Sequence, residues 1–138
     1  MPIYQDGPVE VIVTAENGRT LRLGNVVRSG NGMVDSYDAT LTVPGGSVTT
    51  TVHEYGAWLP GFLRELSDAW KGFDGVKSFA SLEGELTIDA RHDGLGTVSC
   101  EVTLRQPWPP EWSLSVVLDF GAGAHLEAIA DEIDALLG

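Results

Sequence analysis

The chain has 138 residues, of which 43% are hydrophobic and 20% charged, proportions typical of one globular domain and not of a disordered or membrane-spanning chain. Its twenty acidic and eight basic residues give a net charge of −12, which argues against nucleic acid as a partner because phosphate binding needs cations. The acidity fits either plain solubility or the attraction of a basic protein partner. Since Cys100 is the single cysteine and no basic-then-apolar leader opens the chain, we expect a cytoplasmic protein without an intrachain disulfide.

Residues 9–52 carry the alternating, β-branched pattern of antiparallel strands. Clusters of Gly, Pro and Asn between the alternating runs supply the turns. The predicted strands are Val9–Thr14, Thr20–Leu23, Tyr37–Val43 and Val48–Val52.

The apolar period then changes from two to about three and a half, as expected for an amphipathic helix. Eight apolar residues from Trp58 onwards fall on one stripe, which predicts a helix that begins near Ala57 and ends at Gly72. Pro60 is tolerated only in the first turn of such a helix. Since Trp58 and Trp70 both lie on the stripe, we expect both in the core.

Three further strands and a second helix complete the chain. The strands are predicted at Glu85–Ala90, Val98–Leu104 and Trp112–Leu118, and the helix carries an apolar stripe from Leu126 to Leu137. The opposite face of this helix is acidic, with Glu127, Asp131, Glu132 and Asp134. We therefore expect a single α+β domain over residues 1–138, with an antiparallel sheet of about seven to eight strands and two amphipathic helices.

The two halves of the chain resemble each other. Glu54–Ala57 precedes the first helix and Asp119–Ala122 precedes the second, and both segments read acidic, aromatic, Gly, Ala. This pattern defines half-repeats of about residues 9–73 and 76–138. Either an ancestral duplication produced them, or two strand-to-helix corners reached the same solution because Gly permits a sharp bend.

No catalytic or metal-binding motif is recognisable. His53, His92 and His125 share no local motif, and Cys100 lies in an alternating strand where burial would raise its pKa and leave it inert. Nucleophile-elbow, Cys-x-x-Cys and phosphate-loop patterns are missing from the sequence. We predict no catalytic residue, no metal and no cofactor, while carboxylate pairs stay open because their geometry depends on the fold.

Trp108 lies in the Pro-rich segment Gln106–Pro110 between two predicted strands. It either folds back over the edge of the sheet or is exposed, in which case it is a plausible anchor for a partner.

A pattern over about residues 50–138 resembles a known family. It consists of helix positions Phe62 to Trp70, a strand that begins at Leu82–Glu83–Gly84, a hairpin at Asp93–Gly96 and the final amphipathic helix. Over about residues 50–138 it resembles a bacterial family of unknown function and, more distantly, the WapI-type immunity proteins of contact-dependent toxins. The resemblance implies no catalytic residues, because an immunity protein works by occluding its toxin.

The leading hypothesis is a non-enzymatic acidic binding protein, specifically an immunity-type inhibitor that occludes a basic toxin. The predicted partner-binding residues are Glu127, Asp131, Glu132, Asp134 and Trp108. Two alternatives are a small-molecule-binding domain or enzyme with a pocket in a curved sheet, and an assembly module that forms a homodimer. We expect neither nucleic acid nor a membrane as a partner.

Overall fold

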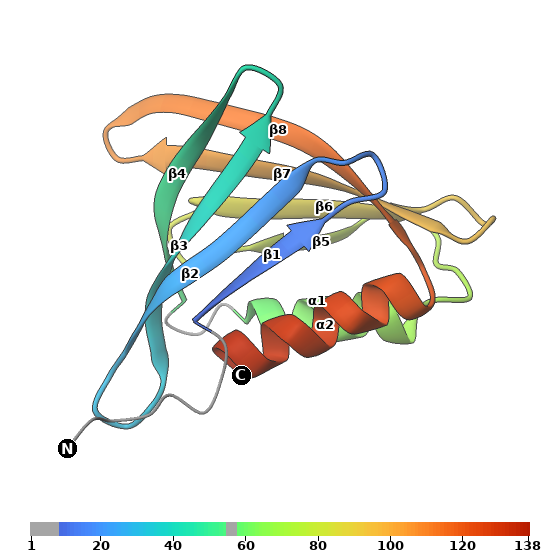
Figure 1. Ribbon diagram of the computed structural model, residues 1–138, viewed down its shortest axis with the longest axis horizontal. Coiled ribbons are helices and arrows are strands. Elements are labelled where there is room, and N and C mark those ends of the chain that lie inside the picture. The colour runs from blue at the N-terminus through green and yellow to red at the C-terminus, as the bar shows by residue number, and fades with distance from the viewer. Residues whose placement is uncertain (1–8, 55–57) are drawn as a thin grey trace.

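The computed structural model describes residues 9–54 and 58–138, and each half of the chain forms four antiparallel strands followed by a helix (Figure 1). In the first half, sheet A has the strand order β1 (Glu10–Thr14), β2 (Thr20–Arg28), β3 (Val34–Val43) and β4 (Gly46–His53), and α1 (Leu59–Asp68) follows. In the second half, sheet B has the order β5 (Lys77–Ala80), β6 (Leu86–His92), β7 (Thr97–Pro107) and β8 (Pro110–Gly121), and α2 (Ala124–Leu137) follows. The predicted α+β class with antiparallel strands and two helices is confirmed, and the strands divide into two sheets.

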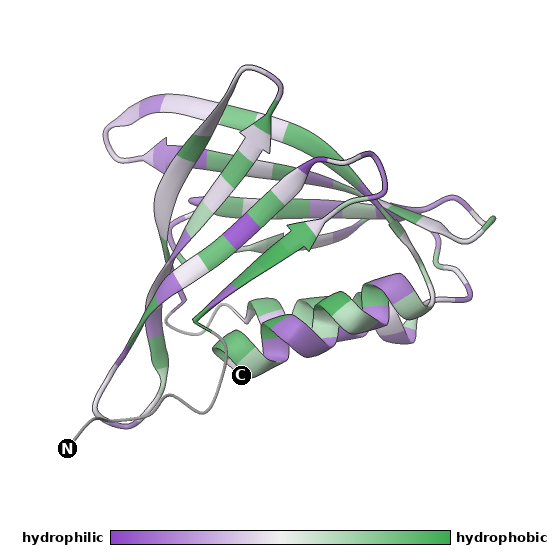
Figure 2. Cartoon of the chain, in the orientation of Figure 1, coloured by the Kyte–Doolittle hydropathy of each residue, from purple (hydrophilic) through white to green (hydrophobic). Residues whose placement is uncertain are grey.

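The two sheets face each other at an angle, and α1 and α2 lie side by side and antiparallel across the open end between them (Figure 1). Apolar and polar residues alternate along the strands, so that each sheet turns one apolar face inward (Figure 2). One cluster of buried residues includes members of both sheets and both helices. Each fully buried leucine in it, such as Leu23, Leu104 or Leu126, contributes about 1.5–3 kcal/mol through burial.

Backbone hydrogen bonds join the sheets at two corners. At one corner the Glu16 N–H donates to the Asp119 carbonyl at 2.8 Å, which ties the β1–β2 turn to β8. At the other corner the Leu82 N–H donates to the His53 carbonyl at 3.2 Å, which ties the β5–β6 turn to the end of β4. The second corner brings together residues from both halves of the chain.

The first helix differs from its prediction. It ends at Asp68, short of Gly72, and the predicted start at Ala57 lies outside the described residues. Trp58 and Trp70 are 57% and 52% exposed, so their placement in the core is wrong. Trp58 occupies the N-cap position and Trp70 follows the C-cap, and helical periodicity does not govern the direction of a side chain outside the helix.

Two smaller differences lie in the second half. Strand β5 was not predicted, since four residues are too few to show a periodic pattern. Leu82–Glu83–Gly84, expected to begin a strand, forms a turn in which Gly84 has a φ of +77°. Within the described residues, neither helix is long and apolar enough to cross a membrane.

Candidate functional site

Five polar side chains gather at the corner where β4 meets the β5–β6 turn, and we call them the corner cluster: Tyr37, His53, Glu54, Ser81 and Glu85. Glu54 and Glu85 are only 7% and 3% exposed. Burial of two carboxylates is costly unless each is hydrogen-bonded, so their hydrogen-bond partners determine whether each carboxyl group is ionised.

Glu85 accepts hydrogen bonds from both sheets. One carboxylate oxygen, Oε2, lies 2.5 Å from Nδ1 of His53 and 3.2 Å from the backbone nitrogen of the same residue. The other, Oε1, accepts from the Ser81 hydroxyl at 2.7 Å. Burial opposes the charge on Glu85, but these hydrogen bonds from His53 and Ser81 outweigh it and hold the pKa of the carboxyl below its ordinary value. An ionised Glu85 therefore clamps β4 onto the β5–β6 turn.

Glu54 accepts a hydrogen bond of 2.6 Å from the hydroxyl of the fully buried Tyr37. Burial raises the pKa of Glu54 to about 7, although the Tyr37 hydroxyl and the Leu59 N–H favour the charged form. Burial and the neighbouring Glu54 carboxyl also raise the pKa of Tyr37. The corner thus holds two carboxyl groups whose environments push their pKa values in opposite directions.

A groove of about 850 Å³ opens beside the cluster, and we call it the corner groove. Its walls come from β4, the β5–β6 turn and the β7–β8 hairpin. The lining residues are Asp38, Thr49, Thr50, Thr51, His53, Glu83, Glu85, Gln106, Pro107, Trp108 and Trp112. Asp38 of β3, Thr49 and Thr51 share one face of sheet A, and Thr50 between them also lines the groove, so the groove covers part of that face together with the edge of β4.

The corner groove combines acidic and aromatic groups. Among the residues that the structure describes, Asp38, Glu83 and Glu85 line it and no Lys or Arg does. Trp108 is 87% exposed on its hairpin wall, so of the two alternatives for this residue the folded-back one is wrong. Trp112 is partly buried and packs against the core. Such a surface suits a cationic side chain that stacks on an indole.

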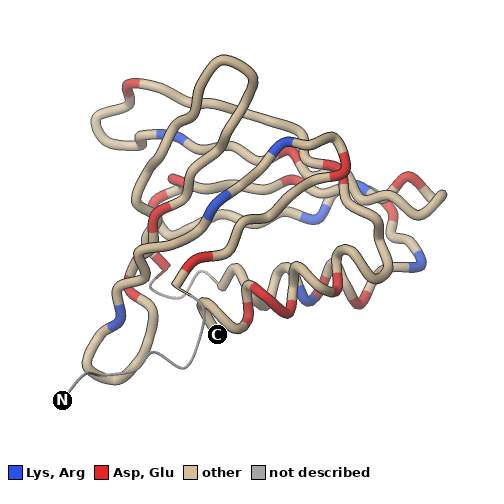
Figure 3. The backbone as a smooth tube through the Cα atoms, viewed as in Figure 1, with Lys and Arg blue, Asp and Glu red and all other residues tan. Residues whose placement is uncertain are grey.

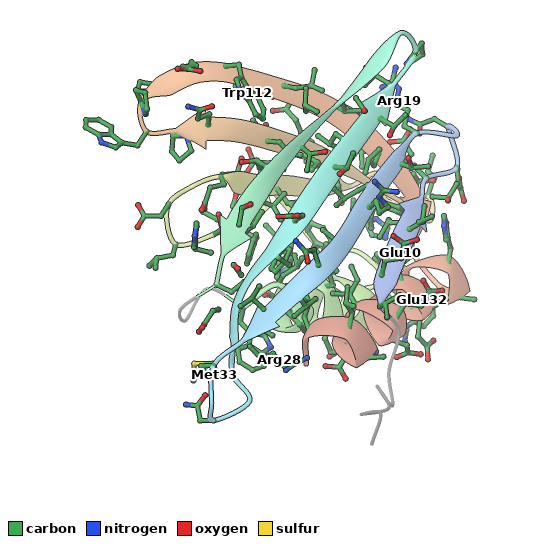
Figure 4. The ribbon with its side chains drawn as sticks, turned by 60° about the vertical axis from the view of Figure 1, so that its left-hand side comes forward. Glu10, Arg19, Arg28, Met33, Trp112 and Glu132 are labelled. Atoms are coloured by element: carbon green, nitrogen blue, oxygen red, sulfur yellow. The ribbon has the colours of Figure 1, made fainter. Side chains whose placement is uncertain are left out.

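The other predicted binding residues lie elsewhere. Glu127, Asp131, Glu132 and Asp134 are exposed on α2, and Asp131 forms an ion pair of 2.7 Å with Arg64 of α1. Trp112 of the groove and Glu132 of α2 are at opposite ends of the molecule (Figure 4). Acidic positions are spread over both sheets as well as α2 (Figure 3). The structure therefore does not bring Trp108 together with the acidic face of α2.

Sequence reasoning missed the corner cluster, although two signals pointed to it. Tyr37 shares the inward face of β3 with Ala39 and Leu41, and a buried phenol needs a hydrogen-bond partner. Glu54 continues the inward alternation of Val52, which places a carboxylate toward the core. The partnership of His53 with Glu85 left no local signal, because the two residues are 32 positions apart.

The hydrogen bonds of the corner cluster connect β4 to the β5–β6 turn, and they do not pair a nucleophile with a base. A carboxylate that orients a histidine is one half of a catalytic triad. The Ser81 hydroxyl, however, bonds to the opposite oxygen of Glu85 from the one that faces His53. In the described parts of the chain, no three His, Cys, Asp or Glu residues are placed to hold a metal ion.

The interior between the sheets is filled. A void of only about 20 Å³ lies among residues such as Leu21, Ile88, Cys100 and Ile133, which is far below the roughly 300–1,000 Å³ of small-molecule pockets. Burial raises the pKa of the Cys100 thiol to about 12, as expected for an inert cysteine.

A second hollow, of about 330 Å³, lies between the β2–β3 hairpin and the ends of the helices. Its lining is mainly apolar and includes Met33, Glu54, Trp58 and Leu137. Residues 55–57, which link Glu54 to Trp58, lie outside the described part of the chain, and we assign this hollow no ligand.

Comparison with known proteins gave a family match. A family model with the description "family of unknown function" matches residues 12–138. No curated protein and no solved structure matches the chain significantly. The function therefore has to be inferred from the site itself.

Proposed function

We propose that this chain, which belongs to DUF6228, is a non-enzymatic binding protein whose corner groove receives a basic segment of a partner protein. DUF6228 is a family of unknown function, and its model covers residues 12–138. The net charge of −12 favours a basic partner, because long-range attraction raises the rate of association.

The observation that carries this proposal is the position of Trp108. A tryptophan that is 87% exposed makes few contacts within its own chain, so folding does not explain its exposure to water. It stands in the wall of a groove whose charged lining residues are acidic. Tryptophan is enriched among the residues that dominate binding energy at protein interfaces.

The specific form that we propose is an immunity-type inhibitor that occludes a basic toxin. Its support is the residue pattern over about residues 50–138 that resembles WapI-type immunity proteins, together with the acidic charge. In this form the groove covers the toxin surface that carries the activity.

The test is capture of partners from the source cell, at low and then moderate salt, with three forms of the protein. These are the unaltered chain, Glu83→Lys in the groove and Glu132→Lys on α2. Both substitutions replace an exposed acid and change the net charge equally. We expect a basic protein to be captured by the unaltered chain and by Glu132→Lys, and to be reduced at least about tenfold by Glu83→Lys.

A toxin inhibited by the chain would support the specific form. Loss of the captured protein with Glu132→Lys and not with Glu83→Lys would move the binding surface to α2. Capture of acidic proteins only, or equal capture by all three forms, would contradict the proposal.

A further inference from the structure

The outer edge of β4 has unpaired backbone groups that point into the corner groove. The direction of these groups follows from His53, whose N–H donates to the Glu85 carboxylate and whose carbonyl accepts from the Leu82 N–H. Both groups of His53 therefore point away from β3. In an antiparallel pair the direction alternates with each residue, so the N–H and C=O groups of Thr51 and Thr49 also point outward. Within the described residues, the outward N–H and C=O groups of Thr49 and Thr51 have no hydrogen-bond partner.

Neighbouring elements also lie along the other sheet edges, and β4 itself comes close to β7. Strand β1 lies beside α2, and the His125 ring bonds the Thr14 carbonyl at its end. Strand β5 has four residues and lies beside α1. The β8 carbonyl of Val117 accepts from Asn17 in the β1–β2 turn.

The sequence of β4 carries none of the features that protect an edge strand. Proteins discourage pairing at exposed edges with Lys, Pro, inward charges or bulges. The segment Ser47–Val52 has no charged residue, no proline and no break in its register with β3. Its Thr and Val residues have high strand propensity. Across the groove, Pro107 and Pro110 lack the N–H groups that would let the β7–β8 hairpin end pair with β4.

We propose that the partner of this protein binds by strand addition: an extended basic segment of another protein pairs with β4 at Thr49 and Thr51 and fills the corner groove. This inference rests on the proposed function and adds the binding mode. The Leu82 N–H already makes one rung of this ladder at His53, and the added strand continues it. The accessible edge from Thr49 to Thr51 accommodates about three residues at about 3.3 Å each.

The charges of the groove determine the composition of the added strand. Glu83 lines the turn wall and Asp38 lines the sheet face next to Thr51, and among the described residues no Lys or Arg lines the groove to balance them. Lys or Arg at alternate positions of the added strand would face these carboxylates and the ring of Trp108. A second copy of the chain is a poorer occupant, because each copy carries a net charge of −12.

The test uses a labelled eight-residue peptide in which Arg alternates with Val, and the same peptide with every backbone amide N-methylated. Main-chain hydrogen bonds supply much of the affinity in strand addition, so a generic peptide is a suitable probe. We expect saturable binding of the parent peptide and at least about tenfold weaker binding of the methylated one. This comparison leaves the protein unaltered.

Two matched variants test the edge from the protein side. Thr49→Pro removes an outward N–H without removing a bond to β3, while Thr49→Val retains that N–H and also lacks the hydroxyl that bonds to Thr40. We expect Thr49→Pro to weaken peptide binding at least about tenfold and Thr49→Val to leave it within about twofold. Trp108→Ala should weaken it about two- to fivefold through loss of the stacked cation.

The outcomes separate this inference from the proposed function. If Trp108→Ala weakens binding but methylation and Thr49→Pro do not, strand addition is wrong and a basic segment still binds in the groove. If the parent peptide fails to bind up to millimolar concentration, or a matching Glu–Val peptide binds equally well, both proposals are contradicted. If light scattering shows a dimer that Thr49→Pro converts to a monomer, the occupant is a second copy and the inference is overturned.

Discussion

Replacement of Glu54 by Gln tests the electrostatic account of the corner cluster. Gln retains an oxygen that can accept the 2.6 Å hydrogen bond from Tyr37, but it cannot ionise. In the folded protein the Glu54 pKa is about 7, against 4.5 for an unperturbed glutamate, a difference of about 2.5 units. At about 1.4 kcal/mol for each pH unit between the two pKa values, ionisation of Glu54 costs the folded state up to about 3.5 kcal/mol.

The sign of the effect follows from the raised pKa. The folded state binds this proton more tightly than the unfolded state, so stability from Glu54 is fully present below about pH 4.5 and is lost as the pH rises through about 7. The Glu54→Gln variant does not lose this stability as the pH rises, because Gln cannot ionise. The free energy of unfolding of the variant minus that of the unaltered protein should therefore grow by up to about 2.5 kcal/mol between about pH 5 and pH 8.

Urea unfolding followed by tryptophan fluorescence at several pH values measures this difference. Any constant penalty from the amide group cancels, because only the pH dependence is compared. Glu132→Gln, on the exposed face of α2, removes the same charge and serves as the control. A difference that stays constant with pH for Glu54→Gln would show that the carboxyl is ionised throughout and would refute the reasoning.

Three further predictions concern stability and reactivity. The thiol of Cys100 should resist a thiol reagent in the native protein and react once urea unfolds it, because burial raises its pKa to about 12; rapid native labelling would contradict its burial. Glu85→Ala should lower the free energy of unfolding by about 3 kcal/mol, since it leaves His53 and Ser81 without their acceptor, while Glu83→Ala should change it by less than about 0.5 kcal/mol; equal effects in urea titrations would contradict the clamp. Trp108→Ala should leave the thermal midpoint almost unchanged, since the side chain is 87% exposed; a marked drop would show a structural role.

Much of the fold could be predicted from local patterns because the strands alternate cleanly. Tyr37–Val43 and Val98–Leu104 each place their apolar residues on one face, and the structure buries those faces. The apolar stripe of α2 is likewise buried as the period indicates. The division of the strands into two sheets depends on which strand edges meet, and periodicity within a strand carries no information on that point.

The candidate site was harder to predict, because it is made by contacts between distant segments. His53 and Glu85 belong to different halves of the chain, and the groove exists only because β4 passes near the β7–β8 hairpin. The acidic face of α2 was predicted as the binding surface because acidic residues recur at helical spacing along this segment of the sequence. The acids that line the groove come from β3 and from the β5–β6 turn, and they show no regular spacing in the sequence.

The central claim is that the β4 edge and the Trp108 wall form the binding surface, and a titration followed by nuclear magnetic resonance tests it most directly. The isotope-labelled protein is mixed with the Arg–Val peptide, and the backbone amide and indole N–H signals are followed. We expect the largest shifts at Thr49, Thr51 and the Trp108 indole, together with slower hydrogen exchange at the two threonine amides. Shifts confined to Glu127–Asp134 of α2, with the β4 amides unchanged, would contradict the account.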